Sequence, residues 1–347
     1  MDLMTQINTF FYLSLFAFGT LFGSFSSVII YRLKSGEKGI MTGRSHCGSC
    51  NTILKALDLV PVFSWLFRKW KCAYCEKKVS AIYPFLELSA WTLFTLIWYF
   101  LIDFSLILTW DVLEITKLVF WCFIAILSII YIFYDILFLE IHEGVMATGV
   151  WITLAALIAQ TLIQDFTIIP HLSLSAQIYS NEILYWSIGL TFWIIALLYV
   201  IMLKWFDEII DLALLVLAII WFGVFKVFLG VNVTEIVILN GLIWALAIFI
   251  FFFIQIFISK WAWLWGWDLR IAIMIWLALG SLLTFPGMMM TYMIGSVLSL
   301  SYLGYEKLHN KNKGLDTQIP FGPFLALGFF VTIFFQEDFL KLMEIYF

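Results

Sequence analysis

Four of the five cysteines in this sequence stand in two Cys-x-x-Cys pairs within one polar stretch. The pairs are Cys47 with Cys50 and Cys72 with Cys75, and 21 residues separate them. Two such pairs can fold as two tight turns that direct four thiolates at one zinc ion. A shell of four thiolates leaves no position for water, so we expect the zinc to be structural and not catalytic. Two redox dithiols, or four thiols without a metal, are the alternative reading.

Two aspartates that follow long apolar runs could form a second kind of site. These are Asp135 and Asp268. A carboxylate in or beside an apolar helix is costly unless it is partnered or used. Two carboxylates close together share one proton, which suits peptide hydrolysis, because one activates water while the other protonates the carbonyl or the leaving amine. Ordinary interfacial acids are the alternative, and composition alone does not separate Asp268 from Asp207 and Asp211.

Membrane helices would have to position these side chains. Of the 347 residues, 64% are hydrophobic and only 12% are charged, unlike the composition of soluble domains. Because a helix needs roughly 20 apolar residues to cross a bilayer, the sequence predicts an all-α, polytopic membrane helix bundle of about 8–10 spans. The candidate spans are 7–31, 82–103, 115–136, 144–163, 183–203, 209–229, 236–259, 270–287, 289–304 and 320–336.

Basic residues predict the orientation of this bundle. The loop 32–78 holds ten of the 19 lysines and arginines, so the positive-inside rule places it in the cytosol. Alternating sides from there leaves only Lys117, Lys226 and Lys341 outside and brings Asp135 and Asp268 to the cytosolic face. The net charge of −4 argues against nucleic acid as a partner, because nucleic-acid binding normally leaves a basic footprint.

The predicted organisation therefore has three parts. Residues 1–32 form the first membrane helix, and residues 33–79 form a small, zinc-ribbon-like cytosolic loop with the four cysteines. Residues 80–347 form the remaining membrane helices.

Several short motifs follow one another in a fixed order along the chain. They are Gly23-Ser24-Phe25, Val28 and Tyr31-Arg32; the two cysteine pairs enclosing Leu59-Val60-Pro61-Val62-Phe63-Ser64-Trp65; Ser80, Tyr83-Pro84 and Glu87; Asp135 followed by Ile141-His142-Glu143; Trp267-Asp268-Leu269-Arg270 with Gly280; and the segment Ile319 to Gly328. In this order the motifs resemble the type IV prepilin peptidases.

The resemblance implies a membrane aspartyl endopeptidase whose catalytic residues are Asp135 and Asp268. Such an enzyme cuts the basic leader of type IV prepilins, or of type II secretion pseudopilins, at the cytosolic face of the bacterial plasma (inner) membrane. Many members also methylate the new N-terminal amine with S-adenosylmethionine, and in them the cysteine loop is associated with methylation. No residue is assigned here to bind that cofactor. The expected partners are the prepilin helix and the lipid bilayer.

The sequence also departs from the family pattern. The second aspartate motif of the family has the form GxGD, whereas this chain has Trp265 and Trp267 at the two glycine positions, and His142 stands where proline is usual. The stretch between the aspartates is longer, so we expect an extra helical pair near 165–233. An inactive membrane scaffold that binds pilin-like helices is the second hypothesis, and a proton-coupled transporter is the third.

Overall fold

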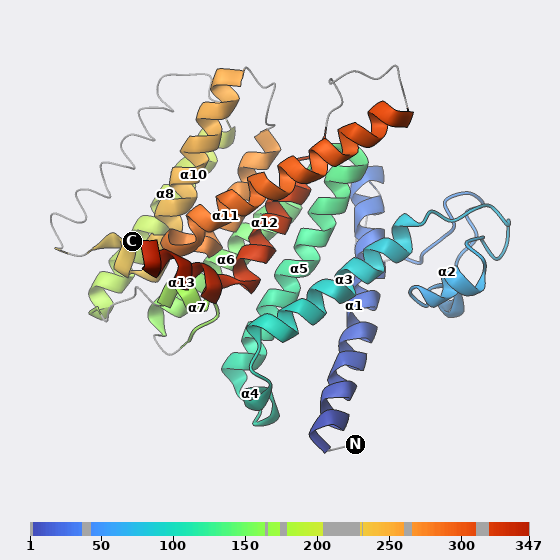
Figure 1. Cartoon of the computed structure of the whole chain (residues 1–347), viewed down its shortest axis with the longest axis horizontal. Coiled ribbons are helices and arrows are strands. Elements are labelled where there is room, and N and C mark those ends of the chain that lie inside the picture. Colours follow the sequence, from blue (N-terminus) through green and yellow to red (C-terminus); the bar gives the residue numbers. More distant parts are fainter. Residues whose placement is uncertain are drawn as a thin grey trace. The chain divides into compact units, whose positions relative to one another are not determined.

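The computed structural model describes residues 3–36, 43–163, 166–173, 179–203, 230, 232–259, 266–309 and 319–346. Within these residues the chain is helical and has no strand, only the isolated bridges His46 to Ile53 and Lys71 to Lys78 (Figure 1). This confirms the predicted all-α class. The chain divides into two compact units, Met1–Met146 and Ala147–Phe347, and each is described by itself.

The first unit contains three long helices and a polar loop. Its helices are α1 (Leu3–Ser35), the short η1 (Ala56–Asp58) and α2 (Phe63–Phe67), α3 (Ile82–Leu101), α4 (Phe104–Leu108) and α5 (Val112–Phe138). The Asp111 side chain caps the start of α5 by accepting a hydrogen bond from the Glu114 amide at 2.9 Å. The helix α5 ends at Leu139, whose left-handed backbone directs its amide to the Asp135 carbonyl.

The helices α1 and α3 cross at very short range around Gly23. A Cβ atom at this position would lie 2.6 Å from the Glu87 Cα and 3.0 Å from the Leu86 carbonyl oxygen, so only glycine permits the backbones to approach this closely. The buried side chains of Ile30, Ile129 and Phe133 belong to one hydrophobic core with Leu86 of α3. The crossing therefore fixes which residues of α1 and α3 face each other.

We expect Gly23→Ala to destabilise the first unit by about 1–3 kcal/mol, because the added methyl group meets backbone atoms that cannot rotate away. The measurement is the thermal unfolding temperature of the purified chain in detergent. Gly304→Ala is the matched control, since an added Cβ there has no atom within 4 Å. Equal unfolding temperatures for the two variants would contradict this view of the helix crossing.

The second unit is built around two long helices. Its elements are the continuation of α6 (Glu143–Leu162), α7 (Pro170–Ser173), α8 (Asn181–Leu203), η2 (Val233–Glu235), α10 (Val237–Ser259), α11 (Gly266–His309), α12 (Gly322–Phe334) and α13 (Gln336–Tyr346). The helix α11 packs against both α10 and α12. Its length suggests one rod, but its backbone is broken at Gly280, where φ is 57° and ψ is −159°.

Buried polar side chains satisfy the backbone groups that this break leaves open. The Asn240 side chain accepts a hydrogen bond from the Ser281 amide at 2.7 Å and donates one to the Thr234 carbonyl at 2.8 Å. The His171 Nε2 atom donates to the Ala278 carbonyl at 2.8 Å. Burial lowers the pKa of His171 to about 4, so the ring is neutral at pH 7. An apolar environment requires such partners at a helix break.

We expect Asn240→Leu to cost about 2–4 kcal/mol of stability, because it leaves the Ser281 amide and the Thr234 carbonyl without their partner in a buried setting. Chemical unfolding in mixed micelles would measure the loss. Gln255→Leu serves as the control, since Gln255 bonds to the hydroxyl of Tyr292, a residue that is 38% exposed. If the two variants have the same free energy of unfolding, the hydrogen bonds of Asn240 do not stabilise the break at Gly280.

Six helices of the described residues are long and apolar enough to cross a membrane, and a seventh results if α12 and α13, which meet at 75°, form one span. Five of the six follow the predicted spans 7–31, 82–103, 115–136, 144–163 and 236–259. The predicted pair 270–287 and 289–304 is wrong in one respect, because the helix continues through Pro286 and breaks at Gly280. The predicted extra segment contains α7 and α8, whereas the predicted span 209–229 lies outside the described residues.

Candidate functional site

The two cysteine pairs fold into two turns of the same design. In the first, the Asn51 amide donates to the Cys47 carbonyl at 2.8 Å, and in the second the Glu76 amide donates to the Cys72 carbonyl at 3.1 Å. The residue after each pair, Asn51 or Glu76, has a positive φ of 55°. This local backbone turns both cysteines of a pair toward the same side, as a metal-binding turn requires.

The folded loop brings all four predicted thiols together. The Sγ atoms of Cys47, Cys50, Cys72 and Cys75 lie within 4.8 Å of one another. Four converging sulfur atoms match the donor set that zinc prefers in structural sites. The cluster fits the predicted structural zinc ion.

Protons are distributed unevenly over this cluster. The Thr52 hydroxyl, 3.3 Å from the Cys50 sulfur, and the Thr52 amide lower the pKa of Cys50 to about 6. The Tyr74 amide likewise lowers the pKa of Cys72. The Lys77 amide lowers the pKa of Cys75, but burial and the neighbouring sulfur atoms outweigh it and raise this pKa to about 11. A cysteine must lose its proton to bind a metal, so the lowered pKa values of Cys50 and Cys72 favour cation binding.

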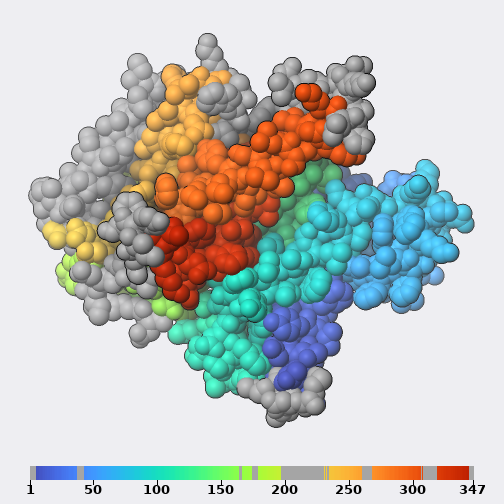
Figure 2. Space-filling model, in the orientation of Figure 1, coloured from blue at the N-terminus to red at the C-terminus, as the bar shows by residue number. Residues whose placement is uncertain are grey.

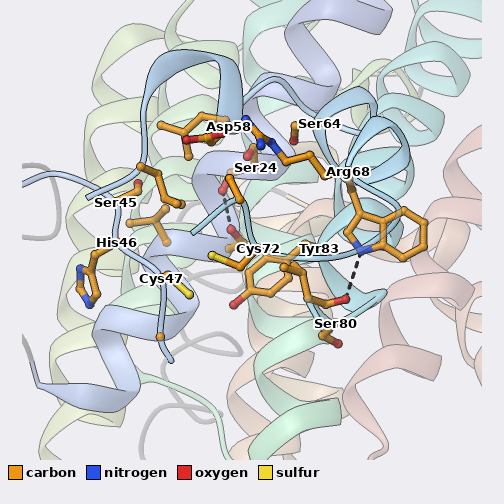
Figure 3. Close-up of a pocket in the computed structure, with 18 of the residues that line it drawn as sticks. Ser24, Ser45, His46, Cys47, Asp58, Ser64, Arg68, Cys72, Ser80 and Tyr83 are labelled. Atoms are coloured by element: carbon orange, nitrogen blue, oxygen red, sulfur yellow. Dashed lines mark hydrogen bonds and ion pairs between the residues drawn. The ribbon is translucent and has the colours of Figure 1, made fainter. Parts of the chain in front are cut away.

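A cavity of about 390 Å³ lies between α1, the cysteine loop and the start of α3 (Figure 3). Cys47 and Cys72 form part of its wall, so the metal-binding cluster and the cavity are contiguous. Serine and tyrosine hydroxyls line it together with charged groups. The charged residues are Arg32, Asp58, Arg68, Lys71, Lys78 and Glu87. This size and mixture of polar and aromatic walls suit a small polar ligand.

Two acidic side chains, Glu87 and Asp58, accept hydrogen bonds that hold the walls of this cavity in place. The Glu87 carboxylate on α3 is 7% exposed, accepts a hydrogen bond from the Val62 amide of the loop at 2.7 Å, and also bonds to Ser24 of α1. Asp58 accepts from the Tyr74 hydroxyl at 2.9 Å and pairs with Arg68. The loop is therefore held to both helices and to itself.

Asp135 lies in the last turn of α5 and is 6% exposed. The connection from α5 to α6 follows it directly, and an ion pair of 2.8 Å between Lys34 of α1 and Glu140 of this connection holds the region together. The ring of Tyr134 lies edge-on to His142, which occupies the usual proline position of the family. Asp135 thus lies at the end of its helix, as predicted, and its side chain is buried there.

Asp268 is 5% exposed and lies in the first turn of α11. The part of α11 that carries it ends at the Gly280 break, so it is shorter than a membrane span. Trp265 lies outside the described residues, and so does the Trp267 side chain. Asp135 and Asp268 belong to different units, so the close approach of their carboxyl groups is still a prediction.

The sequence did not indicate the polar network of His171, Asn240 and Gln336 around the break in α11. The His171 Nδ1 atom lies 3.1 Å from the Gln336 side-chain amide. An asparagine inside the very apolar run 237–259 was the available signal, because a buried amide needs partners. Its partners come from segments far away in sequence.

Helical membrane spans and a loop whose four cysteines could hold a metal ion define a class of polytopic membrane protein. Comparison with known proteins narrows this class. Residues 17–101 match the family described as Bacterial Peptidase A24 N-terminal domain. This N-terminal part supports assignment to the type IV prepilin peptidases, as its motifs predicted.

Several characterised proteins share this similarity. The Type 4 prepilin-like proteins leader peptide-processing enzyme of Escherichia coli O78:H11 is 32% identical over 100 residues, which cover 23% of this chain and 37% of that protein. The Prepilin leader peptidase/N-methyltransferase of Bacillus subtilis is 38% identical over 80 residues, covering 23% and 32%. That of Vibrio cholerae serotype O1 is 41% identical over 86 residues, covering 22% and 34%.

The chain thus spans about a third of the length of these relatives, and both aspartates lie outside residues 17–101. No solved structure matches the chain.

Proposed function

We propose that this chain is a membrane aspartyl endopeptidase that removes the leader of type IV prepilins or pseudopilins and methylates the new N-terminus. One observation carries the proposal: the N-terminal domain of a prepilin peptidase occurs in the same membrane chain as two buried helix-end acids, Asp135 and Asp268. Prepilin processing needs a membrane-embedded enzyme, because the mature end of the substrate begins with an apolar helix.

In the proposed mechanism the two carboxyl groups hold one proton between them. The ionised aspartate takes a proton from water, and the resulting hydroxide attacks the scissile carbonyl while the protonated aspartate donates its proton to the carbonyl oxygen. The tetrahedral intermediate then collapses: the first aspartate returns its proton to the leaving amine, the C–N bond breaks, and the second aspartate takes a proton back from one hydroxyl of the intermediate, so the pair again holds one proton. One water molecule is consumed for each peptide bond that is cut.

The positions of the two acids on their helices suggest a division of roles. Asp268 stands at the N-terminal end of α11, where the positive end of the helix dipole suits an ionised base. Asp135 stands at the C-terminal end of α5, where the negative end suits a protonated acid. The dipoles thus support Asp268 as the base that activates water.

The cavity in the first unit supports a methyl-transfer step. Glu87 could hold the cationic part of S-adenosylmethionine, and Trp65 and Tyr83 offer aromatic walls for its adenine. When bound, this cofactor supplies an electrophilic methyl group. The chain's own contribution is to bind the new N-terminal amine in its neutral form beside that group. The four-cysteine zinc centre holds the wall of the cavity in place.

The proposal places both reactions at the cytosolic face of the bacterial inner membrane. The basic leader would stay in the cytosol near the acids, while the apolar mature segment of the prepilin lies in lipid against the helices. The abundance of lysine and arginine in the loop 32–78 supports this orientation.

Trp265 and Trp267 favour a second candidate, a scaffold that binds pilin-like helices without cutting them, because two indoles occupy positions where glycine would admit the substrate backbone. Mass spectrometry of a prepilin co-expressed with the chain distinguishes the two. We expect a mature N-terminus that is 14 Da heavier than the unmodified one, the mass of one methylene group. Recovery of the intact leader in cells that contain the folded chain would favour the scaffold.

A further inference from the structure

The short helix α2 of the cysteine loop lies against the side of the membrane helices. The ring of Phe63 packs edge-on against Phe16 of α1 with centroids 6.1 Å apart, and Phe16 in turn packs against Trp91 of α3 at 5.2 Å. The Val62 amide, at the start of α2, bonds to Glu87 within α3. In Figure 2 the loop forms a lobe at the side of α3.

The position of Phe16 gives the depth of this contact. The candidate span of α1 is Thr5–Ser35, and about 20 residues cross the hydrocarbon core. Every stretch of that length within Thr5–Ser35 includes Phe16, so a span of that length on α1 contains Phe16. The whole of α3, Ile82–Leu101, is needed for one span, and Trp91 is at its middle. The Phe63 ring therefore lies at hydrocarbon depth as well.

The surface of α2 is apolar and uncovered. In α2, Phe67 is 82% exposed, Leu66 51% and Phe63 44%, and Leu57 of the preceding η1 is 78% exposed. Four large exposed apolar side chains in one short segment are unusual for a loop in water. At the depth given by Phe16, acyl chains of the bilayer are the medium that such a surface requires.

Basic residues follow the apolar residues of α2, as is usual for a segment that lies at a membrane surface. Arg68 and Lys69 come directly after Phe67, and both are exposed. Long basic side chains beside a buried apolar segment extend to the phosphate groups at the membrane surface. Asp58 pairs with the Nη2 atom of Arg68, and the Arg68 side chain stays 41% exposed and can reach an anionic headgroup.

We propose that α2 with Leu57 is immersed in the membrane: its apolar side chains contact phospholipid acyl chains, and Arg68 and Lys69 bind headgroup phosphates. The loop 33–79 is then not wholly cytosolic, because one edge of it enters the lipid. This immersion anchors the cavity at the membrane surface. The proposal depends on the membrane-spanning character of α1 and α3 and not on the proposed enzymatic reactions.

Photocrosslinking tests this contact in the full-length chain. The photoreactive residue p-benzoylphenylalanine replaces Phe67, and the protein is reconstituted without prepilin in nanodiscs of phosphatidylethanolamine and phosphatidylglycerol. Two further positions calibrate the yield: Phe18, an exposed residue in the middle of α1, for lipid, and Lys77, an exposed residue of the second cysteine turn, for water. Replacement of Leu57 repeats the test at a second, equally exposed position.

We expect mass spectrometry to show lipid adducts at position 67 in a yield similar to position 18 and at least about fivefold above position 77. The same order is expected for position 57. A yield at positions 67 and 57 no higher than at position 77 would overturn the proposal. So would adducts to a second copy of the chain in place of lipid. Zinc content near one ion per chain shows that each variant keeps its loop folded.

Discussion

Replacing either aspartate by asparagine should reduce prepilin cleavage by about a thousandfold or more. An amide cannot take a proton from water or donate one in the way that a carboxylic acid does, and general acid and base catalysis each contribute about 10²- to 10⁴-fold. The measurement is the rate of leader release from a purified prepilin in detergent, for Asp135→Asn and Asp268→Asn separately. The double variant should be no worse than either single one, because the two groups act as a unit.

Two comparisons make this result specific. Asp103→Asn should cleave at the parent rate, because Asp103 caps the short helix α4 through the Ser105 amide and has only that structural role. Methylation of a synthetic mature N-terminal peptide should survive both catalytic substitutions, because neither Asp135 nor Asp268 lines the cavity proposed for it. Parent-like cleavage by both Asp135→Asn and Asp268→Asn would rule out the aspartyl mechanism.

Replacing Cys72 by serine should abolish zinc binding at micromolar metal and stop methylation. A hydroxyl is a poor substitute for a thiolate, so we expect the affinity for zinc to fall at least about a hundredfold. Without the ion, the two turns that hold Cys47 and Cys72 in the cavity wall lose their common anchor. Metal analysis by mass spectrometry, together with methyl transfer to the synthetic peptide, measures both effects.

The fifth cysteine provides the control. Cys122→Ser should keep one zinc ion per chain and full methylation, since Cys122 is in α5 and is not part of the cluster. A strong chelator should reproduce the Cys72→Ser effect in the parent protein, and added zinc should reverse it. Full methylation after complete removal of the metal would contradict the structural role of zinc.

The four-cysteine cluster was predictable because the residues that form each turn are adjacent in sequence. Each cysteine turn is encoded within six residues, from Cys47 to Thr52 and from Cys72 to Lys77, and the spacing alone makes two thiols converge. The convergence of the two turns needs only one connecting loop. The sequence could not indicate the cavity beside them, because its walls come from α1 and α3 as well as from the loop.

The membrane helices were predictable from hydropathy, but the break in α11 was not located correctly. Proline and glycine at 286 and 287 are the residues that usually end a helix, yet the helix continues through them. The break occurs at Gly280 because Asn240 and His171 supply hydrogen bonds there. Leu172 also fills the space that a side chain at position 280 would need. Such contacts between distant segments leave no periodic signal in the sequence.

The position of an acid at a helix end does not show from sequence whether the acid is catalytic or a helix cap. Hydropathy placed Asp135 and Asp268 at the ends of apolar runs, and both are buried there. The same pattern describes Asp103 and Asp111, which serve as helix caps. Only the family resemblance distinguished the two proposed catalytic acids from ordinary caps, because burial and position alone do not define a reaction.

The central claim is that Asp135 and Asp268 come close enough to share one water molecule. Cysteines introduced at both positions in a Cys122→Ser background, with zinc protecting the four native thiols, can be treated with a short bifunctional thiol reagent in nanodiscs. Lys34→Cys with Glu140→Cys, a pair joined by a 2.8 Å ion pair in the parent, calibrates the reaction. We predict that mass spectrometry finds positions 135 and 268 linked as efficiently as this pair. Efficient linkage of positions 34 and 140 with none between 135 and 268 would contradict the account.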